Sequence, residues 1–231
     1  NSDGSQSSTV SVNTTAGFSI VKFVNNTGST ANTFGHGLGA VPKMIIMRSL
    51  DDAYNWDVHH NKIAISKRLV LNSSAAQANS TYMNSTSPTN QVFTVKSDEF
   101  GSNSNCIAYC FAEKKGYSKF GSYEGNGDTN GPFIYTGFKP AFLIQKSAAT
   151  AVSWYMFDNK RDPINLVDQR FVADANVSEA TEQGCDFLSN GFKIRTSNVG
   201  TNNSATTYIY MAFAEEPLVA NVGNSLPATA R

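Results

Sequence analysis

The sequence lacks a surplus of charge of either sign, since 18 lysines and arginines balance 18 aspartates and glutamates among 231 residues. Binding to nucleic acid or to anionic lipid depends on a basic surplus, so both partners are disfavoured. No apolar run approaches the roughly 18 residues typical of a membrane-spanning helix. Hydrophobic residues make up 40% of the chain, which is enough for a globular core. We therefore expect a folded protein that neither binds nucleic acid nor inserts into a membrane.

Cysteine is also scarce. The chain has three, Cys106, Cys110 and Cys185, and an odd number gives no complete disulfide framework. In an extended strand the first two lie on one face but roughly 13 Å apart, which is too far for a disulfide. The sequence places no further metal ligands beside them. We predict three buried free thiols, in keeping with assembly in a reducing bacterial cytoplasm, and neither a metal site nor a cofactor.

Histidine is equally rare, and the chain has no Gly-x-Ser-x-Gly motif of the kind that presents a catalytic serine. His36 lies between two glycines, which favours a turn. His59 and His60 are adjacent, so in a strand they point to opposite faces, and we expect His59 to face inward and His60 outward. Scattered carboxylates leave glycoside hydrolysis open, because the fold positions such residues. The protein is predicted not to be an enzyme.

The segment 124–131 alternates oxygen-bearing side chains with small residues, as calcium-binding loops do. The twelfth position of such a loop carries a bidentate glutamate, whereas this sequence has Tyr135 there. A solvated hairpin loop is therefore favoured over a calcium site.

The two halves of the sequence resemble one another. The only tryptophans, Trp56 and Trp154, lie 98 residues apart (154 − 56), and both precede an Asn-Lys pair at the same distance. Residues 107–113 and 209–215 both run from Ile to Phe-Ala-Glu, at an offset of 102 (209 − 107). The small change in offset is what loops of unequal length produce. The pattern predicts an internal duplication of a module of about 100 residues.

Within the first module, short apolar or alternating runs are separated by clusters of Gly, Pro, Asn and Ser, a pattern typical of strands joined by turns. The predicted strands are Ser19–Val24, Lys43–Arg48, Trp56–His59, Lys67–Leu71 and Gln91–Val95. One short helix is predicted near 177–183. The fold class is therefore predicted as all-β, with two tandem β-sandwich, jelly-roll-like modules. The predicted segments are an N-terminal linker or arm (1–16), module 1 (17–116), module 2 (117–217) and a C-terminal tail (218–231).

Several motifs resemble the repeated module of phage tail-fibre and other virion structural proteins, which abounds in cyanophages. The resemblance is carried by residues 35–46, 108–113, 117–127, 186–193 and 208–215. It implies a virion structural protein, most simply the distal part of a tail fibre that takes part in host attachment. Capsid decoration or a fibre spacer without receptor binding is the alternative, and an envelope glycan hydrolase is a less favoured one.

The resemblance also implies partners and a location. Tail fibres are commonly trimers, so a homotrimer is expected, assembled in the host cytoplasm and carried on the virion with other virion proteins. The expected external partner is a glycan or protein receptor on the host cell. No functional residues are transferred from the family. Each tryptophan fits either core packing or stacking on a ligand, and the candidate binding residues are Trp56, His60, Tyr82, Trp154 and Asp158.

Overall fold

A computed structural model describes residues 1–215 apart from 27–30, 97–99 and 102. The described part of the chain is nearly all β, with one short helix, α1 (Val199–Asn202). The predicted all-β class is confirmed. None of the helical structure within these residues is long and apolar enough to cross a membrane. The predicted tail, 218–231, lies outside the described residues.

The chain forms two compact units. The first unit comprises Asn1–Asn72 and Gln77–Glu113, and the second comprises Ser73–Ala76 and the chain from Lys114 onward. The sequence places the change of module after residue 116, and the change of unit follows Glu113.

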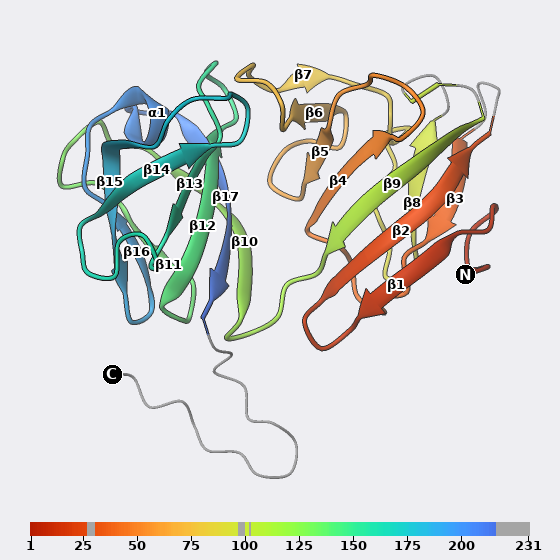
Figure 1. The fold of residues 1–231 in the computed structure, drawn as a ribbon, viewed down its shortest axis with the longest axis horizontal. Coiled ribbons are helices and arrows are strands. Elements are labelled where there is room, and N and C mark those ends of the chain that lie inside the picture. Colours follow the sequence, from red (N-terminus) through yellow and green to blue (C-terminus); the bar gives the residue numbers. More distant parts are fainter. Residues whose placement is uncertain (27–30, 97–99, 102, 216–231) are drawn as a thin grey trace, which may run out of the picture. The chain divides into compact units, whose positions relative to one another are not determined.

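The first unit is built on a seven-stranded antiparallel sheet (Figure 1). Its spatial order is β1 (Thr9–Asn13), β2 (Phe18–Asn25), β9 (Ser104–Phe111), β4 (Met44–Ser49), β5 (Asp57–His60), β6 (Lys67–Val70) and β7 (Ala78–Asn79). A second sheet contains β3 (Ala31–Gly35) and β8 (Val92–Lys96). The five strands predicted in this half are confirmed, with ends that differ by at most one residue.

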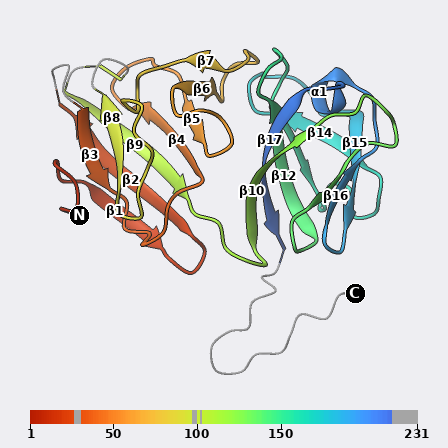
Figure 2. The same cartoon turned by 180° about the vertical axis from the view of Figure 1, so that it is seen from behind.

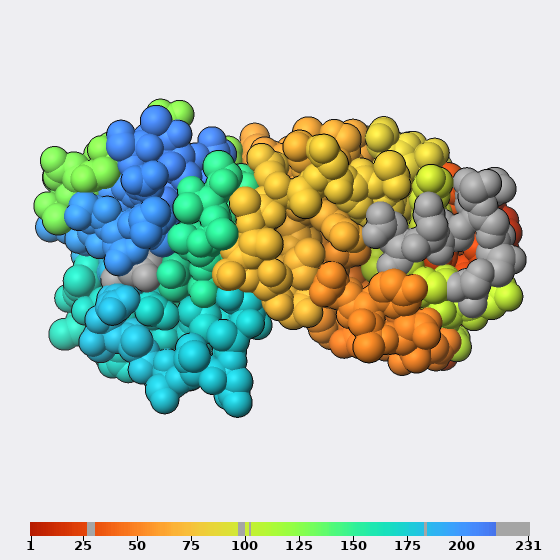
Figure 3. Space-filling model, turned by 90° about the horizontal axis from the view of Figure 1, so that it is seen from above, coloured from red at the N-terminus to blue at the C-terminus, as the bar shows by residue number. Residues whose placement is uncertain are grey.

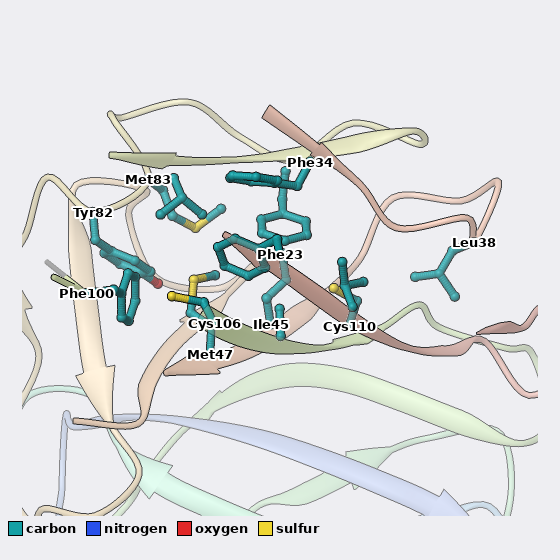
Figure 4. Close-up of a cluster of buried hydrophobic side chains, with 14 of the residues drawn as sticks. Phe23, Phe34, Leu38, Ile45, Met47, Tyr82, Met83, Phe100, Cys106 and Cys110 are labelled. Atoms are coloured by element: carbon teal, nitrogen blue, oxygen red, sulfur yellow. The ribbon is translucent and has the colours of Figure 1, made fainter. Parts of the chain in front are cut away.

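The two sheets of the first unit enclose a hydrophobic core, which makes this unit a β-sandwich (Figure 4). Phe23 of the large sheet contacts Phe34 and Phe93 of the small one, with ring centroids 4.3 and 5.6 Å apart. Strand β9 alternates buried and half-buried residues, so Cys106 and Cys110 both face this core. Their predicted burial is confirmed.

The N-terminal arm is part of the first unit. Strand β1 pairs with β2 from Thr9 to Asn13, and Val10 packs against the core. Further upstream, the Gln6 amide donates a hydrogen bond to the Thr33 carbonyl at 3.2 Å. Of the two alternatives expected for 1–16, a linker or an arm, these contacts favour a docked arm. Its Ser- and Thr-rich composition hides the Thr-Val-Ser-Val alternation that suits an edge strand.

The second unit has one eight-stranded sheet (Figure 2). Its order is β10 (Ser118–Glu124), β17 (Thr207–Ala214), β12 (Pro140–Ser147), β13 (Tyr155–Asp158), β14 (Val167–Val172), β15 (Ala180–Leu188), β16 (Gly191–Ile194) and β11 (Phe133–Tyr135). All eight strands contribute side chains to one core cluster, which requires the sheet to curl around it. Cys185 is buried in this cluster, as predicted.

The predicted helix near 177–183 is wrong. Residues from Ala180 belong to β15, which pairs with β14 and β16, so the sheet supplies the backbone hydrogen bonds that a helix would have supplied. The helix lies later, in α1, where the Asn198 side chain caps it by accepting a hydrogen bond from the Gly200 amide at 2.8 Å.

The two units share part of their strand order. The sequence β2-β9-β4-β5-β6 in the first unit corresponds to β10-β17-β12-β13-β14 in the second. The Trp56 carbonyl accepts from the Leu71 amide at 2.9 Å, and the Trp154 carbonyl accepts from Ala173 at 3.1 Å. The tryptophan amides donate in the same way, to the side chains of Asn72 and Asp174.

Candidate ligand-binding pocket

His59 is the most unusual polar residue of the first unit. In the β4–β5 pair it lies opposite Ile45, a core residue, so its imidazole faces the inside of the sandwich, as predicted. The side chain is 5% exposed, and burial lowers its pKa to about 4. The imidazole is therefore neutral at physiological pH. Its Nδ1 atom has no hydrogen-bond partner within the described residues. A buried polar atom left in that state costs about 1–3 kcal/mol.

His59 is one of the residues that line a pocket of about 140 Å³, here called the His59 pocket. Its walls are mainly aliphatic and its polar groups are few. The lining residues are Val41, Pro42, Lys43, His59, Asn61, Ile63, Ile65, Ser87 and Pro88. All of them belong to the first unit. Among the residues that line it, none carries a carboxylate and Lys43 alone carries a full charge at neutral pH.

Two turns hold the walls of the pocket. After β5, the Asn61 amide donates to the Lys43 carbonyl at 2.8 Å, and the Ile63 amide donates to the His60 carbonyl at 3.0 Å. These bonds fold residues 61–65 back over the end of the sheet. On the other side, Asn84 and Ser85 both adopt a left-handed backbone, with φ of 48° and 49°. Such conformations are uncommon outside glycine, and here they come shortly before the lining residues Ser87 and Pro88.

The second unit has no polar group at the corresponding position. Phe157 of β13 lies opposite Leu143 of β12, as His59 lies opposite Ile45, and its ring is fully buried. A phenylalanine therefore fills this place in the sheet without any demand for a hydrogen bond. Both Phe157 and His59 therefore pack at this position of their sheets, but only His59 also brings a ring nitrogen that needs a hydrogen bond.

His36 differs from His59 because both of its ring nitrogens are used. Its Nδ1 accepts a hydrogen bond from the Leu38 amide at 3.2 Å, and its Nε2 lies 3.2 Å from the Thr89 carbonyl. An accepting Nδ1 leaves the proton on Nε2, which then donates to that carbonyl. Burial lowers the pKa of His36. This histidine is a fully satisfied structural residue at a turn, as its glycine neighbours predict.

Trp56, a predicted binding residue, is half-buried and already in contact with protein groups. Its ring stacks on Tyr109 with centroids 6.1 Å apart, and the Arg48 guanidinium lies 4.9 Å from its centre. A cation near an aromatic face is an attractive contact that a ligand would have to replace. Trp56 is thus engaged mainly in packing.

Three other predicted binding residues are buried. Tyr82 is fully buried in the first core and makes an edge contact with Phe100 (Figure 4). His60 and Trp154 are 0% and 1% exposed. The expectation that His60 faces solvent is wrong, and none of the three presents a surface to a ligand. A strand pattern tells which face a side chain takes but not what covers that face.

Asp158, the last predicted binding residue, organises a turn. Its carboxylate accepts from the Arg161 guanidinium at 2.6 Å and from the backbone amides of Lys160 and Arg161. Burial by itself would raise the pKa of Asp158, but these hydrogen bonds hold it below its usual value. The structure therefore does not bring the five predicted residues together as one site.

The oxygen-rich loop after β10 is a hydrogen-bonded turn. Asn126 and Asp128 each use a side-chain oxygen to accept a nearby backbone amide, at 3.0 and 2.7 Å. The buried Asn202 side chain donates to the Asp128 carbonyl at 2.8 Å, and Figure 3 shows the green and blue segments side by side. Across the described residues no cluster of three or more His, Cys, Asp or Glu is placed to hold a metal.

Comparison with known families adds one assignment. A family described as a domain of unknown function (DUF7483) matches residues 1–217. The chain belongs to this family. No curated protein matches the chain, and no solved structure matches it.

The DUF7483 match extends over both units and includes every residue of the His59 pocket. The DUF7483 domain therefore comprises the pair of units and not one of them alone. Sequence reasoning missed most of the pocket, because its walls come from separate turns. The single available signal was His59 itself, a histidine aligned with Phe157.

Proposed function

We propose that this protein is a bacteriophage virion structural protein, the distal part of a tail fibre, and that it attaches the virion to a host cell without catalysing a reaction. The observation that carries the attachment role is the His59 pocket, a small and mainly aliphatic pocket that one buried histidine helps to line. Glycoside hydrolysis uses a pair of carboxylates beside the bond that breaks. The lining residues include no carboxylate, so the pocket is better suited to holding a ligand than to cleaving it.

The virion assignment draws on the resemblance of five sequence motifs to phage tail-fibre modules. Two of them, 108–113 and 208–215, overlap the corresponding strands β9 and β17. Both strands lie next to the first long strand of their unit and carry buried side chains to its core. These two motifs therefore contribute to the cores of their units.

The shared strand order supports a further part of the proposal, that the two units arose by internal duplication of one jelly-roll-like module. The tryptophan amide and carbonyl make equivalent hydrogen bonds in both units. Duplication followed by divergence would explain why His59 and Phe157 occupy the same place in the sheet. On this account the first unit retained or acquired a binding pocket while the second kept a packed core.

A trimer would suit weak binding at each pocket. Three copies on one fibre place three identical sites near one cell surface, and linked sites raise overall avidity well above the affinity of one site. The proposed partners are therefore two further copies of this chain, other virion proteins and a receptor on the host cell. The proposed location is the virion surface.

Immunogold electron microscopy tests the location directly. Antibodies raised against the recombinant chain are applied to virions of the phage that encodes it, with pre-immune serum as the control. Gold at the distal end of the tail is the expected result. Gold on the capsid would replace the fibre assignment with capsid decoration, and unlabelled, intact virions would overturn the virion assignment altogether.

A further inference from the structure

We infer that the outer edge of β11, in the second unit, accepts an extended segment of a different protein chain as an additional parallel strand. The segment that fits contains glycine and serine, as residues 4–8 of the N-terminal arm do. This strand-accepting edge is independent of the attachment role proposed above. The first unit carries the evidence, because the equivalent edge is occupied there.

Strand β3 of the first unit and β11 of the second are equivalent. Phe34 of β3 lies opposite Phe93 of β8, and Ile134 of β11 lies opposite Phe192 of β16. Both pairs are buried in the core of their unit. Residues of β3 therefore correspond to residues of β11 at an offset of 100 (134 − 34).

The N-terminal arm covers the outer edge of β3. The Gln6 amide donates to the Thr33 carbonyl at 3.2 Å, and the Thr33 amide donates to the Ser5 hydroxyl at 2.9 Å. The Ser8 hydroxyl donates to the Gly35 carbonyl at 2.8 Å. The bridge that Gln6 forms with β3 is parallel. All three hydrogen bonds use backbone atoms of β3, so they do not depend on the side chains of that strand.

The same edge of β11 has no neighbouring strand among the described residues. Strand β11 is the last of its sheet and pairs with β16 alone. The Pro132 carbonyl and the Thr136 amide are hydrogen-bonded to β16 and to the residue before it. Alternate residues of an antiparallel strand face its partner, so the amides and carbonyls of Phe133 and Tyr135 point away from β16.

The open edge offers the backbone groups that bind the arm in the first unit. At the offset of 100, Phe133 and Tyr135 take the places of Thr33 and Gly35. Their side chains are 46% and 64% exposed, whereas Gly35 is buried. Only the bond from the Ser5 amide to the Thr33 hydroxyl, at 2.7 Å, has no counterpart. Strand addition satisfies an open edge of this kind.

The chemistry of the added strand follows from the arm. A Cβ atom on Gly4 would lie 2.2 Å from the Thr33 carbonyl oxygen, so a segment that approaches as closely needs glycine at that place. The described part of each copy has one such arm, and this arm already occupies β3 of its own chain. A second copy therefore brings no free arm, which favours a different protein as the source.

NMR titration of the full chain tests the inference, with a synthetic peptide of residues 1–10 as the probe. The chain's own arm covers β3, so the equivalent edge that remains open is β11. Saturable shifts of the Phe133 and Tyr135 amides are expected. A Gln6→Pro peptide lacks one donor and should bind several-fold more weakly. Unchanged amides at both residues would overturn the proposal. Shifts confined to Thr33 would also overturn it, because the peptide would then only replace the arm.

Two variants separate backbone pairing from contact with the aromatic ring. Phe133→Pro removes an amide hydrogen that points away from β16, and proline is tolerated at such a position of an edge strand. Phe133→Ser is the matched control, since it removes the same ring and keeps the amide. The peptide should bind several-fold more weakly to Phe133→Pro than to Phe133→Ser. Equal binding by the two folded variants would refute strand addition, and the Gln6→Pro peptide applies the same test to the wild-type chain.

Sedimentation velocity of the chain alone tests the source of the strand. Any self-association of the chain should be the same in wild type, Phe133→Pro and Phe133→Ser. Self-association that Phe133→Pro abolishes and Phe133→Ser retains would assign the added strand to a second copy and refute the choice of a different protein.

Discussion

His59 lies opposite Ile45 across the β4–β5 pair, which turns a histidine toward the hydrophobic side of the first sheet. His59 is among the residues that line the His59 pocket, and its buried Nδ1 atom has no partner among the described residues. Phe157 takes the same place in the second unit. The two units therefore differ at this position, because Phe157 only packs whereas His59 adds a buried nitrogen that has no hydrogen-bond partner among the described residues.

Replacing His59 by phenylalanine should stabilise the ligand-free protein. The variant removes a buried polar atom that has no partner, which is worth about 1–2 kcal/mol in the free energy of unfolding. Urea denaturation followed by tryptophan fluorescence measures the change. Asn61→Ala, at an exposed lining position, is the control and should stay within about 0.5 kcal/mol of wild type. A loss of more than 1 kcal/mol in His59→Phe would show that the imidazole has a structural partner.

Stability should fall as pH falls from about 6.5 toward 4. Burial depresses the folded-state pKa of His59 to about 4, so in this window the unfolded chain binds a proton that the folded chain does not. The loss attributable to His59 reaches about 3 kcal/mol at the low end. His36, whose pKa is also lowered by burial, acts in the same direction.

Urea titrations at pH 7.0, 6.0 and 5.0 measure this dependence in wild type and in His59→Phe. The variant should lose less stability across the range, because it has one proton fewer to take up on unfolding. Identical pH profiles for the two proteins would mean that His59 titrates normally in the folded state, which contradicts its burial.

The three cysteines should not react while the protein is folded. Burial raises the pKa of Cys106 and of Cys110 to about 12 and raises that of Cys185 further, so the nucleophilic thiolate is rare at pH 8. An Ellman assay should detect almost no thiol in the native protein and three thiols after addition of guanidinium chloride. Rapid labelling of one thiol in the native state would place that cysteine at the surface.

The N-terminal arm should contribute to the stability of the first unit. Val10 of β1 packs against the core, so Val10→Asp should lower the free energy of unfolding by about 1–3 kcal/mol. Val12→Asp is the matched control, because Val12 sits on the same strand with 43% of its surface exposed. The measurement is chemical denaturation of both variants. Equal effects of the two substitutions would mean that the arm does not dock on the core.

Alternating hydrophobicity predicted the strands well, because the period of two follows directly from which face a side chain takes. The five strands predicted in the first half are present as β2, β4, β5, β6 and β8. The pairing of the arm with β2 was not predicted, and the helix near 177–183 was predicted wrongly, for one reason. In both places hydrogen bonds to neighbouring strands override a weak local preference, and a local sequence window does not include those neighbours.

The candidate site was less accessible to sequence reasoning than the fold. Exposed aromatic and polar residues were expected to form it, but burial depends on what covers each face, and Tyr82 and Trp154 are covered. The His59 pocket joins residues 41–43 and 87–88 with His59, Asn61, Ile63 and Ile65, which only the folded chain brings together. When the two halves of the sequence are aligned at an offset of 98, His59 corresponds to Phe157. This difference was the one indication of the pocket in the sequence.

Adsorption to host cells is the most direct test of the central claim, that this chain attaches a virion to its host. Fluorescently labelled, correctly assembled protein is added to candidate bacterial hosts, and excess unlabelled protein is tested for its ability to block infection by the phage. The account predicts saturable adsorption that competes with the phage. A folded oligomer that neither adsorbs to a susceptible host nor reduces infection would contradict it.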